Sequence, residues 1–229
     1  MSNKYSQSIK ILRIKRGFSQ SELAIKLCMS RPSYIAIEQG KRELSLSEAE
    51  KLSDIFGVSL LEMESGISAN YEKYKQMIIA YIRNAGSKKD GCITKTKLAK
   101  LVYLADFAWF YNHLKSMSGM QYRKIQYGPV PDSYFRAIDE LFENGMIKIS
   151  PTEDGAILIS QTRNGAKIAL SEINKDEEKL IKNISDKWKS KNTQEIVAFT
   201  HNQLPYAICS DNEIIPYELI TQENPGDVY

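Results

Sequence analysis

The first part of the chain gathers side chains that could hold a nucleic acid. Residues 1–45 contain nine Lys or Arg and three Asp or Glu, a net charge of +6, whereas the rest of the chain sums to −3. Arg31 is the best candidate to read a base, because its guanidinium can donate to O6 and N7 of one guanine. Lys41 and Arg42 are suited to phosphate contacts. A basic block on a near-neutral body indicates that this end meets a polyanion, although each single side chain could equally be a solvated surface charge.

The elements that must position these side chains are expected to be five short helices within residues 5–63. Serines that can cap helix starts and glycines that can end helices punctuate this stretch. The caps are expected at Ser19, Ser30 and Ser45 or Ser47, and the ends at Gly17, Gly40 and Gly57. Glu22 follows Ser19 by three positions, which predicts a capping box. The last short turn is expected over residues 59–62.

Residues 19–38 (SQSELAIKLCMSRPSYIAIE) pair two of these helices across a tight turn. Such a pair sets one helix in the major groove of DNA while the other braces it against the backbone. Ala24 is small enough for the helix crossing, and four apolar positions are expected to be buried: Leu23, Leu27, Tyr34 and Ile37. With its flanks, residues 9–63, the motif resembles the phage-repressor/Xre family of helix-turn-helix proteins. Cys28 departs from the glycine usual at the turn, and is expected to cost some backbone strain.

The resemblance implies which residues meet DNA. Gln20 would contact a phosphate, and the second helix of the motif would face the groove with Arg31, Ser33, Ile35 and Ala36. A single motif of this kind binds weakly, so the family acts as dimers on half-sites one helical turn apart. We therefore expect a homodimer, or a higher oligomer, on double-stranded operator DNA with an inverted repeat.

A small, polar stretch over residues 64–70 is expected to separate two domains, at 1–66 and 70–229. Beyond it, the spacing of apolar residues predicts helices over 74–82, 97–111, 134–142, 171–190 and 193–201, with an irregular tail from Pro205. Residues 146–149 and 156–160 alternate like a small hairpin. The expected fold class is mainly α: a five-helix N-terminal helix-turn-helix domain, then a mostly helical α+β domain with a small β-hairpin.

The second domain has one helix that is apolar nearly all round, within residues 97–111. Lys97, Lys100, Tyr103 and Asp106 follow each other at three-residue spacing on it, and this polar stripe could line a groove. The alternative is that Lys100 and Asp106 are satisfied locally and Tyr103 belongs to the core. His201 is expected to be a hydrogen-bonding residue rather than a catalytic base, because no nucleophile of obvious type accompanies it.

From about Tyr74 to Tyr217 the chain resembles the Panacea domain, a SocA-like antitoxin domain. The resemblance is carried by residues 97–106, by Ser118, Gly119, Tyr122, residues 127–131 and Tyr134, and by residues 200–201, 204–206 and 215–217. The family implies that a partner toxin is neutralised by direct binding and that an attached DNA-binding domain represses its own operon. The Gly128–Pro131 turn is expected to position the following helix, with direct partner contact as the alternative. Candidate partner-binding residues are Lys97, Lys100, Tyr103, Asp106, Tyr122, Tyr127, Pro129 and His201.

Other classes of protein lack support. The chain has no P-loop, GxGxxG, HExxH or nucleophile-elbow motif, so we expect neither an enzyme nor a cofactor. Three scattered cysteines and two histidines indicate no disulfide framework and no metal site. No signal peptide or membrane-spanning run is apparent, which favours a soluble cytoplasmic protein. Two rivals stay open: a regulator that senses a small ligand in a groove beside Tyr103 and Tyr122, and a proteolytic adaptor that hands a toxin to a protease.

Overall fold

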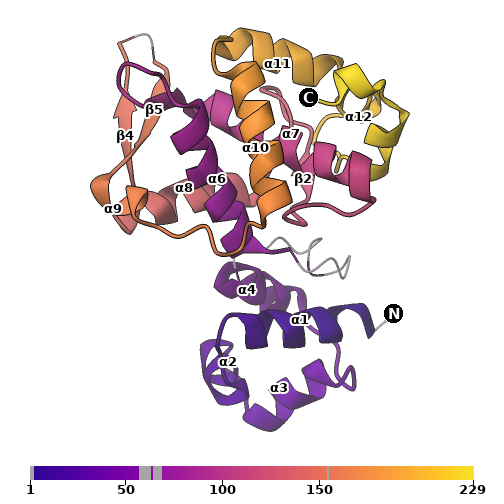
Figure 1. The fold of residues 1–229 in the computed structure, drawn as a ribbon. Coiled ribbons are helices and arrows are strands. Elements are labelled where there is room, and N and C mark those ends of the chain that lie inside the picture. The colour runs from indigo at the N-terminus through magenta and orange to yellow at the C-terminus, as the bar shows by residue number, and fades with distance from the viewer. Residues whose placement is uncertain (1–2, 57–62, 64–68, 154) are drawn as a thin grey trace. The chain divides into compact units, whose positions relative to one another are not determined.

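The computed structural model describes residues 3–56, 63, 69–153 and 155–229. Contacts within the chain divide it into two compact units, Met1–Ala69 and Asn70–Tyr229, and each is described by itself. Both are built mainly of helices, and the second also holds two small antiparallel sheets (Figure 1). The expected fold class is confirmed at this level. Within the described residues no helix is long and apolar enough to cross a membrane.

The first unit consists of short helices whose ends follow the capping signals of the sequence. Its described helices are α1 (Asn3–Lys15), α2 (Gln20–Lys26), α3 (Arg31–Glu38) and α4 (Leu46–Phe56). Ser19 and Glu22 form the predicted capping box at the start of α2, and Ser30 accepts from the backbone of Ser33 at the start of α3. The fifth helix expected over residues 59–62 lies outside the described residues.

The core of the first unit is formed where α1, α2, α3 and α4 turn their apolar faces inward. Its fully buried side chains include Ile9, Leu23, Tyr34, Leu52 and Phe56. Gly17 and Gly40 have positive φ angles and end α1 and α3, as predicted. Cys28, between α2 and α3, also has a positive φ, +56°. The turn therefore keeps the left-handed backbone that favours glycine, at the cost expected for a residue with a Cβ atom.

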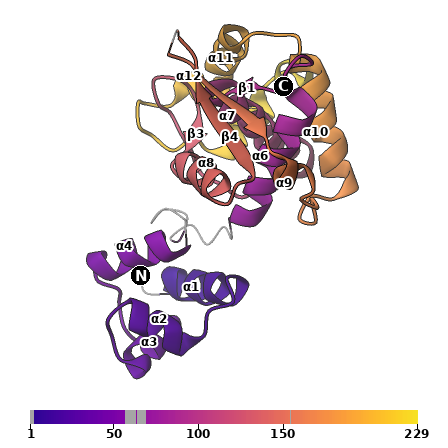
Figure 2. The ribbon, with the colours of Figure 1, turned by 90° about the vertical axis from the view of Figure 1, so that its left-hand side faces the viewer.

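The second unit is arranged around one long helix. Its elements are α6 (Tyr71–Ala85), β1 (Ile93–Thr94), α7 (Lys95–His113), β2 (Tyr122–Arg123), β3 (Val130–Pro131), α8 (Ser133–Glu143), β4 (Ile147–Pro151), β5 (Ile157–Gln161), α9 (Arg163–Ala166), α10 (Lys175–Trp188), α11 (Thr193–Asn202), α12 (Leu204–Ile208) and the 3-10 helices η1 (Tyr217–Gln222) and η2 (Pro225–Asp227). The helix α7 contacts α6, α10, α11 and η1 (Figure 2). Residues 97–108 of α7 are all buried, as its apolar composition predicted.

Two small sheets flank these helices. Strands β4 and β5 form the predicted hairpin, with Ile149 opposite Ile159, and β1 adds a third antiparallel strand on the other side of β5. Strands β2 and β3 pair separately, with Tyr122 opposite Pro131. The tail is not irregular as expected, because α12, η1 and η2 form after Gln203. Pro205 lies near the first turn of α12, where proline is tolerated.

The second unit begins with a residue that joins three segments. The backbone N–H of Asn70 donates to the carbonyl oxygen of Ser118 over 2.6 Å, and its side-chain amide donates to Glu172 over 2.8 Å. The Asn70 side-chain oxygen accepts from the backbone of Lys73 and so caps α6. The start of α6 is thus held by the loop after α7 and by the loop before α10.

Candidate functional sites

The helix-turn-helix presents the first turn of α3 to solvent. Arg31, at the N-terminus of α3, and Lys41, just past its end, are exposed, and neither side chain has a partner among the described residues. Ser33 is half-buried, and its hydroxyl lies 2.9 Å from that of Ser30. Ile35 and Ala36 are also half-buried. The candidate groove-facing residues therefore combine one free cation with a shallow, partly apolar surface.

Two other candidate DNA-contacting side chains already have partners within the unit. Arg42 forms an ion pair with Glu48, 2.8 Å between Nη2 and Oε1. Gln20 donates its side-chain amide to Glu38 over 3.0 Å. Either side chain would have to exchange or share its partner to meet a phosphate. Arg31 and Lys41 carry no such restriction.

A buried polar network holds α3 in place, and the sequence analysis missed it. The guanidinium of Arg13 on α1 donates to Glu38, the last residue of α3, and also to the carbonyl oxygen of Phe18. The hydroxyl of Tyr34 donates to the same carboxylate over 2.8 Å. Burial alone would raise the pKa of Glu38, but the hydrogen bonds from Arg13, Gln20 and Tyr34 outweigh it and leave that pKa lowered. Glu38 therefore stays ionised and ties α1, α2 and α3 together.

In the second unit, the structure disperses the polar stripe of α7. The ammonium of Lys97 donates to the carbonyl oxygens of Lys189 and Lys191, at the end of α10 and in the turn after it. Lys100, 2% exposed, donates to the carbonyl oxygen of Pro129 over 3.0 Å. Each three-residue step along a helix rotates the side-chain direction by about 300°. Four such residues thus fan over half of the helix surface instead of facing one groove.

Tyr103, Asp106 and Tyr122 are fully buried, which corrects their assignment as partner-contacting residues. The Asp106 carboxylate accepts from the backbone and hydroxyl of Ser118 and from the Tyr122 hydroxyl. Burial raises the pKa of Asp106 to about 6, although these hydrogen bonds oppose the rise. The cluster fixes the loop after α7 against that helix, so its role is internal. The groove beside Tyr103 and Tyr122, considered for a small ligand, is occupied by packed aromatic rings.

The turn before β3 brings the remaining candidates together. Tyr127 is 67% exposed, whereas Pro129 is buried. Gly128 has a φ of +97°, and a Cβ atom there would lie 2.7 Å from Cε of Lys100 and 2.9 Å from Nε2 of His201. Glycine is therefore required both by the backbone and by the close approach of these two side chains.

His201 closes the other side of this turn. Its ring stacks on Tyr206, with 4.3 Å between centroids, and its Nε2 is buried without a hydrogen-bond partner in the described structure. Burial lowers its pKa, and the charges of Lys100 and Lys124 act in the same direction, while a hydrogen bond with the backbone of Tyr127 opposes them. The His201 imidazole is therefore neutral and lies beside the buried Lys100.

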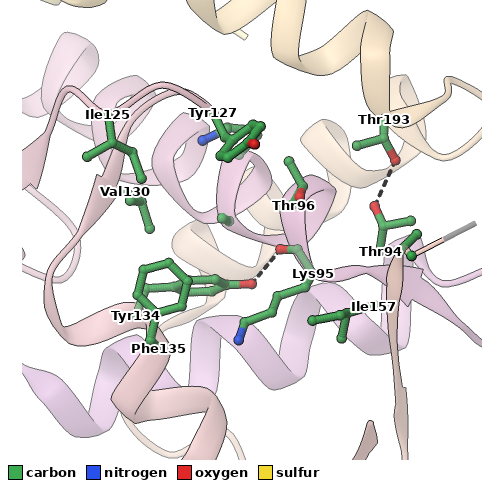
Figure 3. Close-up of a pocket in the computed structure, with 14 residues that line it drawn as sticks. Thr94, Lys95, Thr96, Ile125, Tyr127, Val130, Tyr134, Phe135, Ile157 and Thr193 are labelled. Atoms are coloured by element: carbon green, nitrogen blue, oxygen red, sulfur yellow. Dashed lines mark hydrogen bonds between the residues drawn. The ribbon is translucent and has the colours of Figure 1, made fainter. Parts of the chain in front are cut away.

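A pocket of about 420 Å³ opens beside the same turn (Figure 3). It is lined by the first two turns of α7, the first residue of α11, the 125–130 turn, α8 and the tip of the β4–β5 hairpin. Of the candidate partner-binding residues, only Lys100 and Tyr127 line it. Lys95, Phe135 and Ile157 also line it, and sequence reasoning had not singled them out, because their elements meet only in the folded chain.

Together these features define a helix-turn-helix DNA-binding unit joined to a second helical unit that holds an amphipathic pocket. Residues 9–63 match the helix-turn-helix family, and residues 98–205 match the antitoxin SocA-like Panacea domain. The chain thus belongs to the helix-turn-helix family of regulators and carries a SocA-like Panacea domain, as its motifs predicted.

Curated relatives match a quarter to a third of the chain. The cryptic phage CTXphi transcriptional repressor RstR of Vibrio cholerae is 33% identical over 75 residues, covering 32% of this chain and 68% of the repressor. The control protein C.MunI of a Mycoplasma species is 38% identical over 58 residues, 25% of this chain and 78% of that protein. An uncharacterized HTH-type transcriptional regulator of Methanocaldococcus jannaschii is 42% identical over 52 residues, 23% of this chain and 79% of the regulator. No solved structure was found to match the chain.

Proposed function

We propose that this protein is the antitoxin of a toxin–antitoxin pair, which neutralises a protein toxin by direct binding and represses its own operon. The observation that carries the proposal is the free, exposed Arg31 at the start of a braced α3, on a chain whose other unit is SocA-like. Operator binding and toxin binding are then divided between the two units.

The DNA-binding part of the proposal rests on the geometry of α3. Arg31 lies at the helix N-terminus, the part of a recognition helix that contacts base edges. Lys41 follows the helix and would neutralise one phosphate. A relative named as a transcriptional repressor is 33% identical to this chain over 75 residues. We infer a homodimer on an inverted repeat, since one module alone buries too little surface for tight binding.

The DNA-binding test uses a labelled duplex from the gene's own promoter. We expect fluorescence anisotropy to show binding that weakens steeply with salt, and that is stronger than binding to a scrambled duplex of equal length. Sedimentation should show two chains per duplex. Equal affinity for both duplexes, or no binding at low salt, would contradict repression by this unit. A single chain both free and on DNA would contradict the dimer.

The toxin-binding part rests on the exposed turn of the second unit. Of the candidate partner residues that surround Gly128, Tyr127 offers a large apolar and polar surface to a partner, and tyrosine is favoured at the centre of protein interfaces. The side chains of Lys100 and His201 pack against this turn at Gly128. We therefore place the toxin contact at Tyr127.

The toxin test expresses the gene adjacent to this one, alone and together with this chain. We expect growth inhibition that the chain relieves, an unchanged level of toxin protein, and a stable complex on co-purification. Tyr127→Ala should weaken the complex at least about tenfold, whereas Leu114→Ala, an equally exposed apolar position outside the turn, should not. An adjacent gene without toxicity, or a failed rescue, would overturn the antitoxin assignment. Disappearance of the toxin would point instead to hand-over to a protease.

A further inference from the structure

One edge of the pocket in the second unit has features that favour an anion. Thr94 and Thr193 lie at the starts of α7 and α11, and their hydroxyls are 2.7 Å apart (Figure 3). Two helix N-termini therefore converge at one edge of the pocket. Each contributes partial positive charge and favours an anion.

Two lysines, Lys95 and Lys100, line the same pocket. The Lys95 ammonium lies 4.9 Å from the centre of the Phe135 ring, a cation–π contact at the pocket wall (Figure 3). Lys100 is 98% buried, and among the described residues its ammonium donates to the neutral carbonyl oxygen of Pro129, which leaves two of its three N–H donors for another group. Neither lysine has a carboxylate partner in the described part of the chain.

No acidic side chain is among the described residues that line the pocket. Glu195, on the first turn of α11, caps its own helix through the backbone of Asn192 and pairs with Lys191 at 3.2 Å. A buried ammonium without a counterion is costly, and an anion from outside the chain would relieve that cost.

The other walls are apolar. The apolar lining residues are Ala99, Ile125, Val130, Phe135, Ala156 and Ile157. Phe135 is 47% exposed and Ile157 is 39% exposed, so large apolar surfaces are left open to solvent at the pocket. The volume of about 420 Å³ is in the range of small-molecule sites. An occupant should therefore combine a small anionic head with an apolar body.

We infer that this pocket binds an amphipathic monocarboxylate, with its carboxylate at Lys100 and the start of α7 and its apolar chain against Phe135 and Ile157. Lysine ammonium groups, helix starts and hydroxyl groups line the pocket, and each of them favours a small anionic head. The inference goes beyond the proposed function, because neither operator nor toxin binding requires this ligand.

The test uses octanoate, with octanamide as the matched ligand that keeps the chain and removes the charge. Titration of the isotope-labelled full-length protein, followed by amide NMR, should show octanoate binding with the largest shifts at Thr94, Thr193 and Ile157. Octanamide should bind at least about tenfold more weakly, since it forms no charge-assisted hydrogen bonds. Equal affinity for the two ligands, or no saturable shift with octanoate, would overturn the inference.

Variants assign the contacts. Lys100→Met keeps the side-chain length without charge, and should weaken octanoate at least about tenfold while leaving octanamide within about twofold. Phe135→Ala should weaken both ligands. Phe142→Ala is the control, because it lies on the same helix, is 50% exposed and does not line the pocket, so it should change neither affinity. If Lys100→Met weakens both ligands alike, or Phe142→Ala matches Phe135→Ala, the proposed binding mode is wrong.

Discussion

The guanidinium of Arg13 and the carboxylate of Glu38 face each other across the first unit, with 2.5 Å between Nε and Oε1. The two side chains are 13% and 3% exposed, respectively. Because Arg13 lies on α1 and Glu38 ends α3, this ion pair holds α3 against α1 within the first unit.

Replacing Glu38 by Gln should destabilise the first unit by about 3 kcal/mol, because the Arg13 charge stays buried without its partner. Hydrogen exchange of the α3 amides in the full chain measures the loss. The control is Glu48→Gln, which breaks the exposed Arg42 pair and should cost less than about 1 kcal/mol. Since the folded pKa of Glu38 is lowered, its stabilisation is present at neutral pH and is lost as pH falls through that pKa. Similar losses of stability in Glu38→Gln and Glu48→Gln would contradict a special role of the buried Arg13–Glu38 pair.

Cys28→Gly should stabilise the first unit by about 1 kcal/mol, because glycine adopts the positive φ of this turn without strain. Thermal unfolding of the full chain under reducing conditions measures the gain. Cys28→Ala removes the thiol and keeps the strain, so it should give no such gain. A stabilisation by alanine equal to that by glycine would show that the thiol, not the backbone, is responsible.

Arg31→Ala and Lys41→Ala should weaken DNA binding in different ways. Loss of Arg31 should cost about 1–3 kcal/mol on the operator and little on unrelated DNA, so specificity falls. Loss of Lys41 should weaken both and reduce the salt slope by about 1. Anisotropy titrations on operator and scrambled duplexes at several salt concentrations separate the two effects. Identical behaviour of the two variants would argue against Arg31 as the base reader.

Gly128→Ala should destabilise the second unit by about 3 kcal/mol, through the φ of +97° and through contact with Lys100 and His201. Gly145→Ala is the matched control, since Gly145 has a φ of +66° and open space around its Cβ position. It should cost only about 1 kcal/mol. Urea denaturation gives both values. If the two substitutions cost the same, crowding at Gly128 plays no part.

Lys100 should make stability depend on pH. Burial lowers its pKa to about 7, so between pH 7 and 10.5 the unfolded chain binds a proton that the folded chain does not. Stability should then rise with pH in this window by up to about 1.4 kcal/mol per unit. From pH 9 to pH 7, the wild type should lose about 2 kcal/mol relative to Lys100→Met. Parallel stability curves for the two proteins would contradict a depressed pKa.

Features encoded by neighbouring residues were predictable from sequence. The capping box of Ser19 and Glu22, the cap at Ser30 and the apolar helix around Leu104 depend on residues a few positions apart, and all three appear as expected. Local hydrogen bonds and helical periodicity are enough to specify them.

Features that depend on long-range contacts were not predictable. Arg13 and Glu38 are 25 positions apart, and nothing near either residue shows that they pair. For the stripe on α7 the sequence left two interpretations open, and the burial of Tyr103 and Asp106 fits the one in which they belong to the core, since three-residue spacing rotates around a helix. The pocket draws its walls from five segments, so its composition emerges only once the chain has folded.

The hydrogen bonds of Asn70 determine at which residue a fragment of the second unit should begin. A fragment that starts at Tyr71 would lose the cap of α6, worth about 1 kcal/mol, and would release the carbonyl oxygen of Ser118. That loop also supplies two donors to Asp106, so trimming one residue at the surface would loosen a carboxylate in the interior. Fragments prepared for toxin or ligand studies should therefore retain Asn70.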